Sequence, residues 1–183
     1  MNKCYLSLIR GLASLACAST LLGTPAVGQI TEPALLVRGA VAQPLSLSLS
    51  NMLAMPRIKM TAQEKDGSHV AFEGIALYEL LRLAQPMLTD KCCSNAVNTV
   101  VVVRAADNYQ ALFSLPELDP KFTARQILVA DRRDGQPLSP SQGPLQIIVP
   151  DEKVHGRWVR QVKIIEVLPL GDLSEVSTNR SPR

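Results

Sequence analysis

A basic segment near the carboxyl end of the chain has residue types suited to binding an anion. Within eleven residues, cations surround one histidine, one glycine and one tryptophan: Lys153, His155, Gly156, Arg157, Trp158, Arg160 and Lys163. Arginine presents forked donors that match phosphate or carboxylate oxygens. The segment therefore predicts a site for a small anionic ligand, extended by Arg132 and Arg133 if the fold brings those turns together. A solvated basic loop leading into the last strand is the alternative, and charge alone favours that interpretation.

Cys92 and Cys93 are adjacent, in a polar stretch between Met87 and Asn98. Adjacent cysteines can close only a strained ring, and strained disulfides are the readily reduced kind. Three functional interpretations stay open: a vicinal disulfide, an intermolecular disulfide, and a soft-metal or redox site. The fourth interpretation is a loop pair of no functional consequence.

Other chemistries lack the residues they need. The chain has two histidines, His69 and His155, each interpreted as a surface residue because a tetrahedral metal site needs three or four ligands. No phosphate-binding glycine loop, dinucleotide fingerprint or nucleophile elbow is present. The net charge is only +3, aromatic residues make up 4%, and no run of Lys or Arg occurs, so we expect no nucleic-acid partner.

The first 28 residues have the layout of a secretory signal peptide. Lys3 and Arg10 give a positive start, Leu12–Leu22 is a short apolar run, and small residues precede a cut before Gln29. The run is shorter than the roughly 20 residues that a spanning helix requires. We therefore expect a periplasmic or secreted protein that has no membrane contact after cleavage.

Removing this leader separates the chain into parts with different properties. The leader holds two basic residues, no acidic residue and two of the four cysteines, so 155 residues remain, with 17 basic and 16 acidic side chains. Residues 29–168 are expected to form one domain. Residues 169–183 are polar without an apolar period and are expected to form a flexible tail.

The predicted elements that must position these residues are short strands and a few short helices. Leu77, Leu80, Leu81 and Ala84 have helical spacing, and Pro86 ends that helix. A smaller helix is expected between Pro44 and Pro56. Alternating or continuous apolar runs predict about eight strands, at residues 34–39, 57–63, 69–73, 99–105, 109–113, 126–130, 145–149 and 162–168. The helices do not alternate strictly with the strands, which favours an α+β fold with a mixed sheet. Residues 99–105 are apolar on both faces and are expected to form a central strand.

Taken in order, six segments give the chain a family resemblance. They are Ala34–Ser50, Phe72–Leu81 (FEGIALYELL), Val101–Phe113 (VVVRAADNYQALF), Ile127–Leu138, Gly143–Pro150 (GPLQIIVP) and Arg157–Val167 (RWVRQVKIIEV). This set resembles the oxidoreductase molybdopterin-binding domain, the sulfite-oxidase-like family, and is similar to its short exported members. The resemblance covers about residues 34–168 and implies a mixed α+β, sulfite-oxidase-like fold.

The resemblance also implies a cofactor and where it would be held. Catalytic relatives bind molybdenum through molybdopterin and one cysteine thiolate, and the matching position here is Ala62, with no cysteine between residues 29 and 91. Arg157 and Arg160 match basic residues that contact the pterin phosphate, and Tyr109 and Arg104 are expected to line the same groove. Holo relatives travel folded by a twin-arginine route, whereas this leader has no Arg-Arg pair.

Three functional hypotheses follow from the resemblance and the residues together. The first is a catalytically degenerate member that binds a small anionic ligand or a periplasmic protein partner. The second is a genuine molybdopterin-dependent oxidoreductase with a non-cysteine metal environment, in which Asp107 or Tyr109 lies near the metal. The third is a thiol redox module that acts through Cys92 and Cys93.

Overall fold

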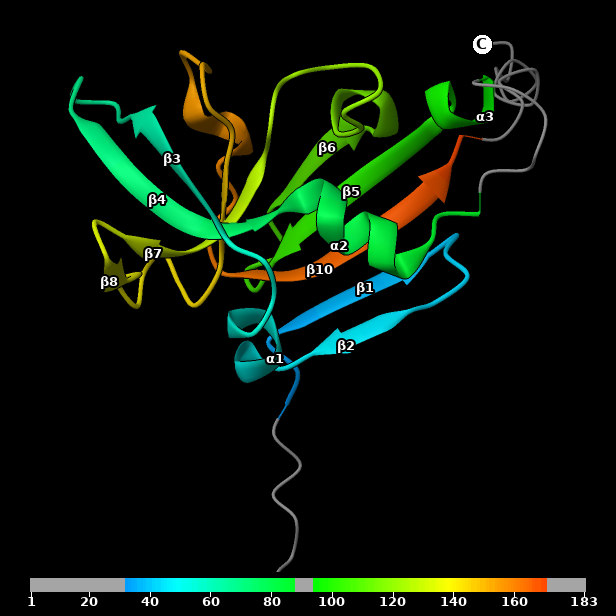
Figure 1. The fold of residues 1–183 in the computed structure, drawn as a ribbon, viewed down its shortest axis with the longest axis horizontal. Helices are drawn as coiled ribbons and strands as arrows, with labels where there is room; N and C mark the ends of the chain where they lie inside the picture. The colour runs from blue at the N-terminus through cyan, green and yellow to red at the C-terminus, as the bar shows by residue number, and fades with distance from the viewer. Residues whose placement is uncertain (1–31, 88–93, 171–183) are drawn as a thin grey trace, which may run out of the picture. The chain divides into compact units, whose positions relative to one another are not determined.

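The computed structural model describes residues 32–87 and 94–170, and these form two β-sheets with short helices. Figure 1 shows the first sheet, made of β1, β2, β5, β6 and β10, beside the second, which contains β3, β4, β7 and β8. The expected signal peptide, the carboxyl-terminal tail, and Cys92 and Cys93 lie outside the described residues.

The first sheet has five strands in the order β2-β1-β10-β5-β6. Their bounds are Leu35–Gly39 (β1), Leu45–Leu47 (β2), Thr99–Ala105 (β5), Gln110–Ser114 (β6) and Val162–Pro169 (β10). β1 runs parallel to β10 and the other neighbours are antiparallel, so the sheet is mixed, as predicted. The prediction that residues 99–105 form a central strand is confirmed, because β5 lies inside this sheet, between β10 and β6.

The second sheet has the order β3-β4-β7-β8, with β9 also paired to β7. Its strands are Ile58–Gln63 (β3), His69–Ala76 (β4), Leu128–Arg133 (β7), Gln136–Pro137 (β8) and Gln146–Ile148 (β9). Gly74 is required where β4 meets β7, since a Cβ there would lie 2.0 Å from the carbonyl oxygen of Val129. The prediction of a single sheet is therefore replaced by two.

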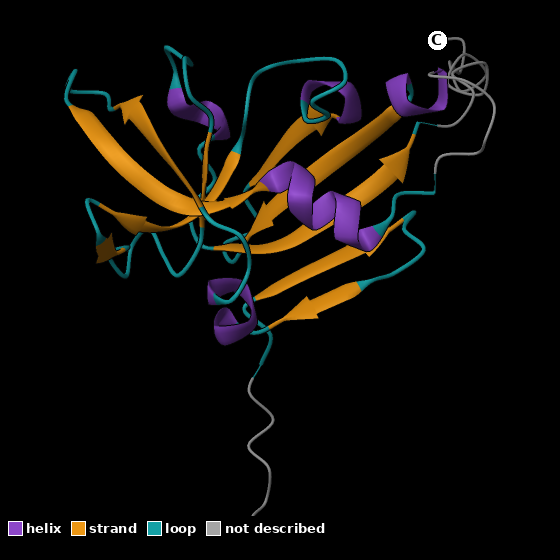
Figure 2. Ribbon diagram, viewed as in Figure 1, coloured by secondary structure: helices purple, strands orange, loops and turns teal. Residues whose placement is uncertain are grey.

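The helices are few and short (Figure 2). They are Leu49–Leu53 (α1), Leu77–Ala84 (α2) and Ser94–Val97 (α3), with 3₁₀ turns at Leu115–Glu117 (η1) and His155–Arg157 (η2). Ser48 caps α1, where its hydroxyl accepts from the Asn51 backbone N–H at 3.2 Å. α2 has the bounds that the apolar spacing predicts, and Gln85 ends it in the left-handed conformation.

One hydrophobic cluster holds the described domain together. It contains fully buried side chains from both sheets and from α2, including Val37, Phe72, Leu80, Phe113 and Ile165. No helix in residues 32–87 or 94–170 is long and apolar enough to cross a membrane.

Candidate functional site

A cavity of about 480 Å³ forms where loops from both sheets meet. Its walls come from the turn between β3 and β4, the turn between β5 and β6, the start of β9, and the segment around η2. The lining residues are Glu64, Lys65, Asp66, Ala105, Asp107, Tyr109, Gln142, Gln146, His155, Gly156, Trp158 and Arg160. The segments lie far apart in the sequence, so the fold alone creates this site.

Aromatic side chains form one wall of the cavity. The Tyr109 hydroxyl donates to the Gly156 carbonyl oxygen at 2.6 Å, which joins the β5–β6 turn to η2. The His155 ring stacks on Trp158, with centroids 3.9 Å apart and planes at 14°. Trp158 is fixed in turn by its indole N–H, which donates to the Val149 carbonyl oxygen at 2.9 Å. Both η2 and the ring that it presents are therefore held in place.

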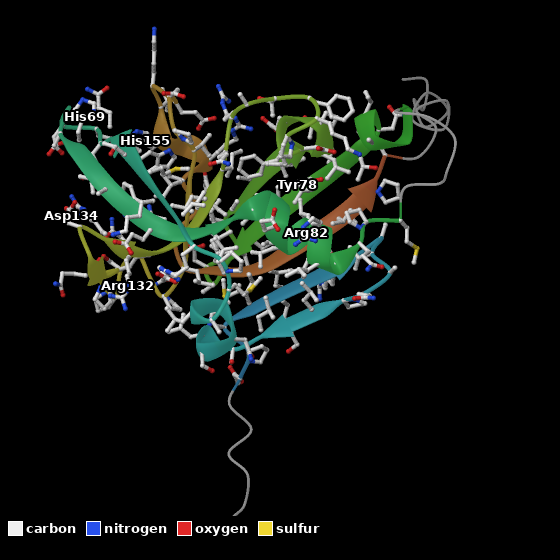
Figure 3. The ribbon with its side chains drawn as sticks, viewed as in Figure 1. His69, Tyr78, Arg82, Arg132, Asp134 and His155 are labelled. Atoms are coloured by element: carbon white, nitrogen blue, oxygen red, sulfur yellow. The ribbon has the colours of Figure 1, made fainter. Side chains whose placement is uncertain are left out.

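Figure 3 labels the two histidines, His155 from the segment that contains η2 and His69 at the start of β4. His69 is exposed, as interpreted from the sequence. His155 is half-buried and lines the cavity, which sequence reasoning did not indicate.

Gln146 has a buried side-chain oxygen without a hydrogen-bond partner among the described residues. Its side chain is buried, with 2% of the residue exposed, and its Oε1 has no hydrogen-bond partner among the described residues. An unpaired buried polar atom costs about 1–3 kcal/mol, and such atoms are rare in folded proteins. The carboxamide of Gln146 is thus in the condition expected of a group that meets a ligand.

The charged residues at the cavity divide into engaged carboxylates and free cations. Asp66 accepts from the Ser68 hydroxyl and backbone N–H at 2.7 and 2.9 Å, and these bonds lower the pKa of Asp66. The Asp107 carboxylate accepts a hydrogen bond from the backbone N–H of Tyr109 at 2.9 Å. Within the described part of the chain, Arg160 and Lys65 are exposed and have no hydrogen-bond or ion-pair partner.

Glu64, the third carboxylate of the lining, is also engaged. It lies 2.9 Å from the Nη2 of Arg133, which belongs to β7. Arg133 therefore offsets the charge of Glu64. The other arginine of that predicted pair, Arg132, donates to the Gly135 carbonyl oxygen at 3.1 Å within its own turn, and neither arginine lines the cavity.

Arg157 lies outside the lining although the resemblance implies a phosphate contact for it. Its guanidinium donates to Glu152 through Nε at 2.7 Å and to Glu117 at 3.0 and 3.1 Å, and it sits 4.8 Å from the centroid of the Phe113 ring. Burial acts to lower the pKa of Arg157, but the hydrogen bonds with Glu152 and Glu117 outweigh it and raise the pKa. The Arg157 guanidinium is thus paired with two carboxylates.

Arg104 also lies away from the cavity. Its guanidinium donates to Glu166 on β10, at 2.9 Å from Nη2 and 3.2 Å from Nε, and Arg38 on β1 reaches the other oxygen of Glu166 at 3.2 Å. The structure therefore brings together two of the four expected groove residues, Tyr109 and Arg160, and places the other two in ion pairs.

Sequence reasoning missed several lining residues, chiefly Gln146, Gln142 and Lys65. One signal for Gln146 was present, because it is the single polar residue in the apolar run Leu145–Val149. No sequence signal places the β3–β4 turn and Arg160 at the same cavity, since this depends on how the two sheets are arranged.

The described residues do not offer the metal ligand that the family resemblance implies. Ala62, at the expected thiolate position on β3, is buried at 4% exposure in the hydrophobic cluster and pairs with Val70. Residues 32–87 and 94–170 contain no cysteine, and within them no three His, Cys, Asp or Glu residues are grouped to hold a metal ion. This donor set does not fit a cysteine-ligated molybdenum centre.

Comparisons with known proteins agree with the fold. Among solved structures, the chain is similar to the sulfane dehydrogenase SoxCD from Paracoccus pantotrophus, with a TM-score of 0.58 and 17% identity. That match covers 76% of this chain and 39% of the SoxCD chain, and at this identity it shows the fold alone. A search of curated proteins found no match. Residues 23–171 match the profile of the oxidoreductase molybdopterin binding domain, and the chain therefore belongs to that family.

Proposed function

We propose that this protein is an exported, catalytically degenerate member of the family, a module that binds a small ligand and performs no molybdenum redox chemistry. The observation that carries the proposal is alanine at position 62, where the resemblance implies the thiolate. An alanine methyl group has no lone pair to donate to a metal, and Ala62 is packed among apolar side chains.

The cavity supports the binding half of the proposal. Binding sites for small molecules are concave and have volumes of about 300–1,000 Å³, and this cavity falls within that range at about 480 Å³. It combines a rigid aromatic wall with an unpaired carboxamide and two free cations. A small ligand with an anionic group suits this set, and a periplasmic protein partner that inserts such a group would use the same contacts.

Metal analysis tests the degenerate assignment directly. The full chain, purified from cells that make molybdenum cofactor, should contain far less than one molybdenum atom per chain and show no pterin fluorescence after denaturation. A family member that has the cysteine, produced and purified in the same way, is the positive control. Stoichiometric molybdenum in this protein would overturn the proposal in favour of a genuine oxidoreductase.

Export is tested separately. A periplasmic location predicts that osmotic shock releases a protein whose amino terminus is Gln29, read by mass spectrometry of the intact chain. A full-length chain retained in the cytoplasm would refute this part of the proposal and leave the metal result unaffected.

A further inference from the structure

We propose that β6 is a docking edge for a second copy of this chain, so that the protein forms a weak dimer through antiparallel pairing of two β6 strands. Figure 1 shows β6 at one side of the first sheet, where β5 is its only neighbour in the strand order. Residues Gln110–Ser114 of β6 do not line the cavity, and the inference does not depend on the proposed function.

The outer edge of β6 has backbone groups without a partner. The Ala105 N–H donates to the Tyr109 carbonyl oxygen at 2.9 Å, which fixes the alternation of hydrogen bonds between β5 and β6. Alternate residues then point toward β5, beginning with Tyr109 and Ala111, and the backbone groups of Gln110 and Leu112 point away from it. Among the described residues, no hydrogen bond engages the N–H or C=O of Gln110 or Leu112. Such a row of donors and acceptors is a template for another extended strand.

The outward row ends at Ser114, whose N–H is already engaged. It donates to the Glu117 carboxylate at 2.7 Å, in the capping box that begins η1. The open part of the edge is therefore formed by Gln110 and Leu112, and a partner strand must pair the N–H and the C=O of both.

The other edge strands have features that oppose pairing, whereas β6 has none of them. β2 has three residues and follows Pro44, β8 has two residues and includes Pro137, and Lys59 on β3 has 75% of its side chain exposed. Short length, proline and lysine are means by which natural sheets avoid association at their edges. β6 has five residues, none of them charged and none of them proline. Its edge is therefore the one suited to pairing among these four.

The symmetry of the edge favours a second copy as its occupant. Pairing about Ala111 across a two-fold axis joins Gln110 of each copy to Leu112 of the other, and each joined pair exchanges two hydrogen bonds. Every open N–H and C=O of both edges is then satisfied. Leu112, which is 58% exposed beside the buried Val102, meets the other copy's Leu112 as a diagonal neighbour. No like charges face each other, since β6 has no charged side chain.

The dimer should be weak, because the open edge is short. Interfaces that bury less than about 1,000 Å² belong to weak or transient complexes, and we expect a Kd of about 10–100 µM. Sedimentation velocity of the natively produced chain should therefore show mostly monomer at about 1 µM and mostly dimer at about 500 µM.

Substitutions and hydrogen exchange assign the contact to β6. Leu112→Lys places a like charge on both edges and should weaken the dimer at least tenfold. Leu53→Lys, at a leucine of α1 that is 43% exposed, is the matched control and should dimerise as the native chain does. Circular dichroism confirms that both variants are folded. In the native chain, the amides of Gln110 and Leu112 should exchange more slowly at the higher concentration, while those of β3 are unchanged.

Three results would overturn this inference. The first is a chain that stays monomeric at about 500 µM, which would leave the edge to a strand of another protein. The second is a dimer that Leu112→Lys does not weaken. The third is a dimer in which the amides of Gln110 and Leu112 exchange as fast as in the monomer, because that dimer would use another surface.

Discussion

Replacing Gln146 with leucine should stabilise the ligand-free protein, although Gln146 is buried. The substitution removes a polar atom that has no partner and fills its place with apolar carbon of similar size. Replacing an unsatisfied buried polar group by an apolar one of the same shape is neutral or stabilising. The stability of the domain and its ligand binding therefore change in opposite directions at this residue.

The magnitude follows from the penalty that the native chain carries. An unpaired buried acceptor costs about 1–3 kcal/mol, and imperfect packing of the branched leucine costs up to about 1.5 kcal/mol, as for other shape changes in a core. We expect a net gain in the free energy of unfolding of about 1 kcal/mol, which corresponds to a rise in Tm of about 2–4 °C for a domain of this size.

Gln142 provides a matched control in the same cavity. Its Oε1 accepts a hydrogen bond from the Ser139 hydroxyl at 3.0 Å, so the carboxamide of Gln142 is satisfied. Gln142→Leu should lower the free energy of unfolding by about 0.5–1 kcal/mol, the value of one ordinary hydrogen bond. Two identical substitutions at one cavity are thus expected to have opposite signs.

Urea unfolding at pH 7, followed by circular dichroism, measures both effects. Destabilisation of the ligand-free protein by 1 kcal/mol or more in Gln146→Leu would refute the reasoning, because it would mean that the carboxamide has a partner within the domain.

Three further substitutions test the framework around the site. Asp131→Asn should lower the free energy of unfolding by about 2–4 kcal/mol in urea titrations at pH 7, because Asp131 is 5% exposed in its side chain and holds Arg57 through bonds of 2.5 and 2.8 Å. Gly74→Ala should prevent the pairing of β4 with β7, and we expect loss of soluble folded protein in expression assays. The hydrogen bond from Lys59 lowers the pKa of Glu73, so the stability from this pair is present above the ordinary carboxyl pKa and is lost as the pH falls through the lowered value. The Tm should therefore fall less steeply between pH 6 and pH 3 in Glu73→Gln than in the native protein. An equal dependence of Tm on pH in the two proteins would contradict a stabilising pair between Lys59 and Glu73.

The elements that sequence predicted best are those whose signal is local. α2 has the predicted bounds because four apolar residues at helical spacing and the following Pro86 are all within one segment. The order of the strands has no such local signal. Val101 and Val103 on β5 and Ile165 on β10 are all fully buried, which is typical of strands inside a sheet, but only the pairing with distant strands sets the order of β5 and β10 within it.

The site was predictable only in part for the same reason. Tyr109 and Arg160 were expected in the groove and line the cavity. Lys65 was not, because its turn meets the cavity only after β4 pairs with β7, which begins 52 residues after the end of β4. A polar residue in an apolar run, such as Gln146, is the kind of local anomaly that could have been used.

The two arginines of the basic segment show why a charge count cannot define a binding site. Arg157 and Arg160 are separated by Trp158 and Val159, which are both buried, so the chain turns inward between them and the two guanidinium groups reach different surroundings. Arg157 meets Glu117 from 40 residues earlier and Glu152 from five earlier, and this network anchors η2, which presents His155 to the cavity. Arg160 lines the cavity and meets no carboxylate among the described residues, so its guanidinium is available to a ligand. Because one arginine fixes the wall and the other remains free, their substitution should separate folding from binding. Loss of Arg157 should weaken the binding of every ligand of the cavity by loosening the wall, whereas loss of Arg160 should weaken only ligands with an acid group.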